Sequence, residues 1–311
     1  MTATITEPPA TGAATRLRTA TAGVRLSISW LGVRRTLNRE QQHQAAETFD
    51  AAGEYVAASK KLLDTRHPAF QAVARVRGRA VALWKGVTLP FPEPGVRLIK
   101  QDEIADFDRR MTELAAELAA AVATLDERYA ELRELARERL GRLYEAGDYP
   151  LRLTDEFAFA WDYPPVEPPD YLQRLHPELY ERECRRVAQQ FDEAVQLAEQ
   201  AFCTEFGSLV SRLAERLSGR RDGKPKVFRD SAVENLHEFF ERFRRLNAGS
   251  NDELQRLIAD AQGLLRGVAP AALRDNVALR REVASELSRV EAGLDQLLMD
   301  RPRRRVLRRG Q

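Results

Sequence analysis

Cysteine and histidine are scarce in this chain of 311 residues, which has two cysteines and four histidines. Cys184 and Cys203 fall within one predicted helix, so about 28 Å of helix separates them at 1.5 Å per residue. They are too far apart to form a disulfide with each other, and they lack the CxxC spacing of a thiolate zinc site. Free thiols are typical of a reducing compartment, so we expect a cytoplasmic protein.

Long apolar runs and the common catalytic motifs are also missing. No stretch approaches the roughly 18 apolar residues that a membrane-spanning helix needs, so we expect no membrane partner. The phosphate-binding patterns GxGxxG and GxxxxGK(S/T) are absent, and so is the nucleophile pattern GxSxG. We therefore expect no catalytic residues, no cofactor and no enzymatic activity.

Charge is distributed unevenly, although the formal net charge is only +2. Residues 1–39 contain six arginines and one glutamate, and the tail over 301–311 contains six arginines and no acid. Such basic ends can contact an anionic partner such as nucleic acid, or they can be solvated and flexible. The tail lacks the interleaved aromatic residues of a base-stacking platform. The candidate phosphate-binding residues are Arg301, Arg303, Arg304, Arg305, Arg308 and Arg309.

Three segments predict a small β element. Apolar and polar residues alternate from Val24 to Trp30, which predicts a strand with one apolar face. Prolines and glycines exclude a helix over 86–100, where two short apolar runs within 87–99 predict a loose β-hairpin or an extended arm. Alternating aromatic residues predict another strand over 156–163.

Helical periodicity dominates the remainder. A helix is predicted from the N-cap residue Asn38 to about Asp64, and another follows Pro68. Two much longer helices are predicted at about 103–146 and 177–218. In the first of these, apolar residues recur at coiled-coil spacing until the pattern shifts after Leu125.

The two long helices are similar in length, which predicts that they form a long antiparallel, coiled-coil-like hairpin. The predicted fold class is therefore mainly α, with this hairpin, a small β element and a helical C-terminal region. The predicted organisation is a disordered leader (1–22), an α-rich domain (23–218), a polar linker (219–229), C-terminal helices (230–300) and the basic tail (301–311).

The pattern ExxH occurs twice on predicted helices, as Glu40 with His43 and as Glu234 with His237. Two such pairs together with two further glutamates build a di-metal site in some helical bundles. However, no further glutamate lies on the apolar stripe of either long helix, where the remaining ligands would have to be. Chance and a solvated polar face are the competing explanation, so a metal site remains a remote alternative.

Several short motifs follow one another between residues 24 and 218. They are Ser29-Trp30-Leu31-Gly32, Lys60-Lys61-Leu62-Leu63-Asp64, Leu89-Pro90-Phe91, Gly95-Val96-Arg97-Leu98-Ile99 and Asp148-Tyr149-Pro150. Their order resembles that of a family of uncharacterised bacterial and phage proteins, the domain of unknown function 3150. The resemblance implies a role in an assembly with AAA+ ATPase and von Willebrand-type partners and not catalysis. None of the motifs is catalytic, so no functional residue is carried over.

Together these features favour a non-enzymatic interaction or scaffolding protein of a bacterial or phage multi-protein assembly, which acts through long amphipathic helices. Because large exposed apolar faces are uncommon in monomers, self-association is expected through any stripe that is left uncovered. The first alternative is a nucleic-acid-associated protein that uses its arginine-rich termini. The second is a di-metal oxidoreductase, which depends on the paired ExxH pattern alone.

Overall fold

The computed structural model describes residues 12–218, 230–247, 249 and 251–299. These residues form eleven α-helices and short antiparallel β-ladders, so the chain is mainly helical, as predicted. The described residues divide into two compact units. The first unit comprises residues 12–23, 87–101 and 164–299, and the second comprises residues 24–86 and 102–163.

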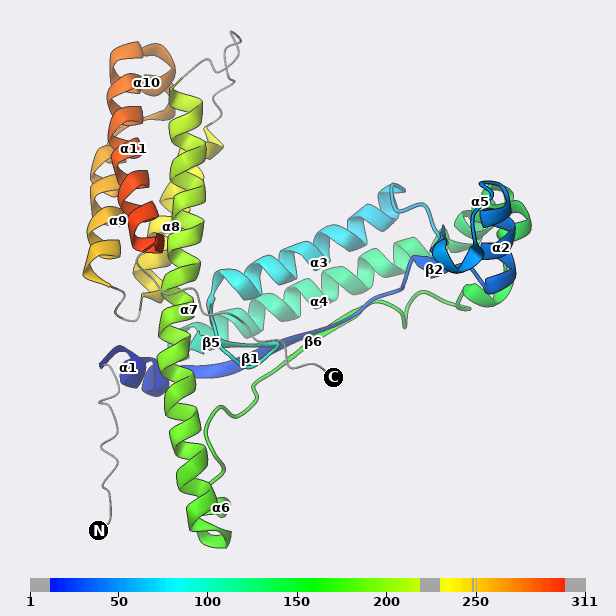
Figure 1. The fold of residues 1–311 in the computed structure, drawn as a ribbon, viewed down its shortest axis with the longest axis horizontal. Helices are drawn as coiled ribbons and strands as arrows, with labels where there is room; N and C mark the ends of the chain where they lie inside the picture. The colour runs from blue at the N-terminus through cyan, green and yellow to red at the C-terminus, as the bar shows by residue number, and fades with distance from the viewer. Residues whose placement is uncertain (1–11, 219–229, 248, 250, 300–311) are drawn as a thin grey trace. The chain divides into compact units, whose positions relative to one another are not determined.

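The first unit is organised around α7 (Pro177–Leu217), which confirms the second predicted long helix. Pro177 occupies the first turn, where its missing N–H needs no partner, and the His176 ring accepts a hydrogen bond from the Leu179 amide. The other helices of the bundle are α8 (Ser231–Leu246), α9 (Asp252–Leu265), α10 (Pro270–Asp275) and α11 (Val277–Met299). Figure 1 shows α8 and α11 running beside α7, and both helices contact it.

Aromatic side chains fill the centre of this bundle. The ring of Phe206 on α7 stacks on that of Phe239 on α8, with centroids 5.2 Å apart. Phe202 meets Phe243 edge to face at 5.0 Å. All four rings belong to one continuous apolar core that extends along α7. The amphipathic stripe on α7 is therefore covered within its own unit.

Residues 12–22 correct one prediction, because they belong to ordered structure and not to a disordered leader. They form α1 (Gly12–Ala20) and the start of β1 (Thr21–Ser29). Ala14 and Leu17 are buried in the core of the first unit, and α1 contacts α7. Burial of these small and branched side chains gives the segment the tertiary support that a short helix needs.

The predicted β-hairpin within residues 87–99 is confirmed in the first unit. Strand β4 (Thr88–Pro90) pairs antiparallel with β5 (Val96–Lys100), with Thr88 opposite Ile99. Gly95 takes a positive φ of 80° in the turn between them, which a residue without a side chain adopts at little cost. The short helix α6 (Tyr171–Leu175) precedes and contacts α7.

The second unit is built on two helices, α3 (Pro68–Gly86) and α4 (Ile104–Glu127), which contact each other and run antiparallel (Figure 1). The predicted helix over 103–146 is divided. It breaks at Arg128 and resumes as α5 (Tyr129–Leu140), at the point where the apolar spacing changes after Leu125. It ends before Gly141, whose φ of 50° does not continue a helix.

The other two predicted strands pair with each other. Strand β1, within which the chain passes from the first unit to the second, is antiparallel to β6 (Ala158–Asp162). Arg25 stands opposite Asp162 and forms a two-bond ion pair with it. The small antiparallel β element is thus confirmed.

The predicted helix from Asn38 to Asp64 is mostly wrong. Asn38 does cap a helix, through a capping box with Gln41, but α2 (Arg39–Glu47) has only nine residues. The chain then turns at Asp50, whose φ is 51°. It continues into the 3₁₀ helix η1 (Gly53–Tyr55) and strand β3 (Ser59–Lys61), which pairs antiparallel with β2 (Arg34–Thr36).

The chain beyond α2 packs back against that helix, because η1 contacts α2. A Cβ atom at residue 53 would lie 2.6 Å from the His43 ring, so the backbone approaches that ring closely at this glycine. Phe49, which follows the C-cap residue Thr48, is 80% exposed.

Pairing of the two long helices is not confirmed. Helix α4 belongs to the second unit, where it packs on α3, whereas α7 belongs to the first unit, where it packs on α11. The unit boundaries accordingly differ from the predicted division into 23–218 and 230–300, because the C-terminal helices complete the same core as α7. The predicted linker at 219–229 lies outside the described residues.

Candidate functional site

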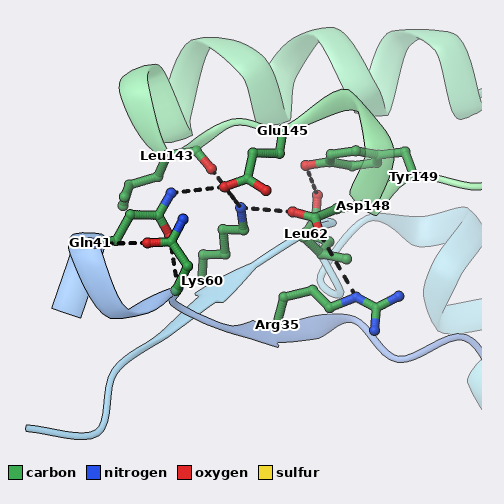
Figure 2. Close-up of polar contacts among 9 residues, drawn as sticks. Arg35, Gln41, Lys60, Leu62, Leu143, Glu145, Asp148 and Tyr149 are labelled. Carbon is green, nitrogen blue, oxygen red and sulfur yellow. Dashed lines mark hydrogen bonds and ion pairs between the residues drawn. The ribbon is translucent and has the colours of Figure 1, made fainter. Parts of the chain in front are cut away.

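A cluster of polar side chains in the second unit surrounds Lys60 (Figure 2). Lys60 lies on β3, opposite Arg35 of β2, and its side chain is only 3% exposed. Its ammonium nitrogen lies 2.7 Å from Oδ2 of Asp148 and 3.2 Å from Oε1 of Glu145. It also donates to the carbonyl of Leu143 at 2.9 Å. An ammonium has three donors, and three acceptors surround this one.

The three acceptors come from one short segment that follows α5. Two 3₁₀ turns, η3 (Gly141–Leu143) and η4 (Ala146–Asp148), bring Leu143, Glu145 and Asp148 to the same nitrogen. Two further hydrogen bonds join this segment to residues 41–62. Gln41 of α2 donates to Glu145 at 2.8 Å, and the Tyr149 hydroxyl donates to the Leu62 carbonyl at 3.0 Å.

These contacts, which we call the Lys60 clamp, keep the amine charged. Burial alone would lower the pKa of Lys60, but hydrogen bonds and attraction from Asp148 and Glu145 outweigh it and raise that pKa. A lysine acts as a nucleophile only as the neutral amine. The charged amine therefore joins two distant segments of the chain through its contacts with Leu143, Glu145 and Asp148.

Tyr149 is held in its neutral form beside the clamp. Burial, followed by the nearby Tyr144 and Asp148, raises its pKa to about 12. Its ring stacks on Tyr144 with centroids 5.1 Å apart. The hydroxyl consequently remains a hydrogen-bond donor to Leu62 at all ordinary pH values.

The residues predicted as remote metal ligands are divided between the units. Glu40 and His43 are exposed on α2 of the second unit, and Glu234 and His237 are exposed on α8 of the first. Among the described residues, no three His, Cys, Asp or Glu side chains gather as a group that could hold a metal ion. The two cysteines, Cys184 and Cys203, are free thiols on α7.

The six arginines predicted to contact phosphates lie outside the described residues. They are Arg301, Arg303, Arg304, Arg305, Arg308 and Arg309. Within the described part of the chain, no helix combines the length and the apolar character that crossing a bilayer requires.

The first unit has an open groove along α7, on a different side of the helix from the aromatic core. Its volume is about 630 Å³. Among the residues that the structure describes, Pro90 of β4 is its one lining residue from outside α7. The α7 residues that line it are Leu197, Gln200, Ala201, Thr204, Glu205, Ser208, Leu209 and Arg212. We call this surface the α7 groove.

The α7 groove is lined by both apolar and small polar side chains. Half-buried leucines and a proline lie beside the small residues Ala201, Thr204 and Ser208, which leave room for another chain to approach. The single carboxylate, Glu205, is ion-paired with Arg242 of α8. The Arg242 guanidinium in turn lies 5.7 Å from the centre of the Phe239 ring. The groove thus offers apolar contact and hydrogen bonds on a rigid, already packed helix.

Sequence reasoning missed both features for identifiable reasons. Lys60 was placed inside a predicted helix, although Gly53 in the middle of that helix is a signal for a turn. The α7 groove lies on the more polar face of α7, and a search for apolar stripes passes over that face. Small residues at helical spacing on this face are the signal that could have found it.

No family model, curated protein or solved structure matches the chain.

Proposed function

We propose that this chain is a non-enzymatic interaction protein that scaffolds a multi-protein assembly, with the α7 groove as its docking surface. The observation that carries the proposal is that the two sides of α7 have different environments. One side is buried in the core of the first unit, and the other forms an open groove lined by leucine, proline and small residues. A helix fixed on one side presents the other without reorganisation, which reduces the cost of binding.

The resemblance to the domain of unknown function 3150 supplies the class of partner. It implies a bacterial or phage assembly that contains an AAA+ ATPase, and we extend that expectation to this chain. An amphipathic helix of the partner would fit the groove, because helices in grooves bind through apolar residues at helical spacing.

Affinity capture by the full-length chain, with and without a blocked groove, tests this function. Ala201 is an exposed residue in the α7 groove, so Ala201→Arg fills the groove without disturbing the core. Ala119, which is exposed on α4 of the second unit, provides a matched control as Ala119→Arg. We expect the wild type and the control to retain the same partners, with an ATPase among them, and Ala201→Arg to lose them.

Equal recovery of partners by all three proteins would remove the α7 groove as the docking surface. Circular dichroism of each variant verifies that the helices are intact, so that a loss of partners reflects the groove and not misfolding.

A further inference from the structure

One face of α7 carries a sequence pattern that is symmetric about its centre. Its positions follow one another at spacings of 4, 4, 3, 4 and 4 residues. Such spacings place all of them on the same side of an α-helix. Every position of the pattern except Glu193 lines the α7 groove. The residues are Glu193, Leu197, Ala201, Thr204, Ser208 and Arg212.

We propose that the α7 groove binds the α7 helix of a second copy of this chain, with the two helices antiparallel around a two-fold axis between Ala201 and Thr204. The inference rests on the proposed function: a second copy occupies the α7 groove of the free chain, and the helix of an assembly partner competes with it for the same surface. In this arrangement Glu193 faces Arg212 of the second copy, and Leu197 faces Ser208 of the second copy. Ala201 faces Thr204 of the second copy across the axis, and each of these pairs occurs twice.

Charge selects the antiparallel direction. Glu193 lies one turn before the groove and Arg212 lies at its opposite end. Two antiparallel copies place a carboxylate beside a guanidinium at both ends. Two parallel copies in register would place glutamate against glutamate and arginine against arginine, so the like charges disfavour that alternative.

Side-chain size also agrees with this register. The large side chain of Leu197 faces the small Ser208, and Ala201, the smallest residue of the pattern, lies beside the axis opposite Thr204 of the second copy. Helix axes approach to within about 8–10 Å according to the side chains between them, so small residues at the centre allow the closer distance. A self-complementary patch of this kind is the requirement for an isologous dimer.

The contact is short. From Glu193 to Arg212 the helix extends about 28 Å at 1.5 Å per residue. Contacts of limited area are typical of transient complexes, so we expect a reversible, concentration-dependent dimer and not a permanent one.

Charge reversal with the full-length chain tests the pairing. Each single reversal, Glu193→Arg or Arg212→Glu, removes two attractive contacts and adds two repulsive ones. We expect each to raise the dissociation constant of the dimer by about tenfold or more, given that exposed ion pairs contribute about 0.2–1 kcal/mol apiece. The double variant Glu193→Arg/Arg212→Glu restores opposite charges at both ends and is expected to return the constant close to the wild-type value.

Sedimentation velocity over a wide concentration series gives the dissociation constants. Arg256→Glu on α9, an exposed reversal outside the groove, is the matched control and should leave the constant unchanged. A wild-type chain that remains monomeric throughout overturns the inference, and so does a dimer that responds equally to the control. Failure of the double variant to restore the dimer overturns it as well.

The capture experiment separates this inference from the function on which it rests. If the chain is monomeric but Ala201→Arg still loses its partners, the groove binds a different protein and only the dimer is refuted. If Ala201→Arg changes neither capture nor self-association, both proposals fail.

Discussion

Both units of this protein bury apolar side chains internally, but the second unit also buries a charged side chain, that of Lys60. In the first, apolar side chains from α7, α8 and α11 form one continuous core. In the second, the segment after α5 is joined to the β2–β3 ribbon by the Lys60 clamp, in which charge and hydrogen bonds converge on one nitrogen. An apolar core distributes its stability over many contacts, whereas a clamp concentrates it in a few groups that must all be present.

The distribution of tryptophan allows the two units to be followed separately. Trp30, Trp84 and Trp161 are the only tryptophans of the chain, and all lie in the second unit. Tryptophan fluorescence therefore reports on the second unit, whereas far-ultraviolet circular dichroism reports on the helices of both. Urea unfolding followed by both probes tests each of the predictions below.

The largest effect is expected from Phe206→Ala in the first unit. Phe206 is fully buried and stacks on Phe239, so the change leaves a cavity and should lower the free energy of unfolding by about 3–5 kcal/mol. Circular dichroism should show an earlier transition. Phe49→Ala, which removes an 80% exposed ring, should stay within about 0.5 kcal/mol of wild type. Equal effects of the two changes would contradict the assignment of the core.

Removal of the clamp cation is expected to have the next largest effect. Lys60→Met leaves Asp148 and the Leu143 carbonyl without their ammonium partner, which should lower the free energy of unfolding of the second unit by about 2 kcal/mol. The fluorescence transition should move to lower urea. Lys61→Met, a change to the exposed neighbour on the same strand, is the matched control. A clamp without structural importance would leave the two variants indistinguishable.

Loss of the α2 cap should cost less. Asn38 accepts from the Gln41 amide at 2.8 Å in a capping box, and Asn38→Ala should lower the free energy of unfolding by about 1 kcal/mol. Gln44→Ala, on the same helix and exposed, keeps the cap and should not destabilise. If both substitutions gave the same midpoint by fluorescence, the cap would not contribute to stability.

Alkaline pH should also weaken the second unit. Folding raises the pKa of Tyr149 from its ordinary 10.0 to about 12 and raises that of Lys60 above 10.5. A raised pKa means that the folded state binds protons more tightly, so its contribution to stability is complete below pH 10 and is lost as the pH rises toward 12. Tyr149→Phe lacks one titrating group and should show a shallower decline over that range by fluorescence. An identical decline would contradict the role of Tyr149.

Signals close together in the sequence were enough to predict much of the fold. Pro177 marks the first turn of α7, and the apolar period carries the helix to its observed end. Alternation likewise identified β1 and β6, although nothing in either strand states that they pair. The element over residues 38–64 was predicted wrongly because its apolar residues fit a helical period by coincidence, while His43 and Gly53 meet in a turn.

The candidate functional surfaces could be predicted less well, because they depend on which segments meet. Lys60 and Asp148 are 88 positions apart in the sequence and lie 2.7 Å apart in the fold. Pro90 contributes to the α7 groove from a strand whose position beside α7 no local pattern reveals. Pairing of the two long helices stays a prediction, because α4 packs on α3 within one unit and α7 packs on α11 within the other.

The two units alternate along the sequence, so the ribosome completes their residues at different times. The second unit ends at residue 163, so all its residues are synthesised before α7 begins, whereas the first unit needs helices that start at residue 231. At about 5–20 residues per second, the wait from residue 163 to the end of α11 is on the order of ten seconds. During that time Leu17 and Leu89, whose final place is the core of the first unit, have no completed core to enter. During that interval the nascent chain contains every residue of the second unit, together with apolar side chains of the first unit whose core has not yet been synthesised.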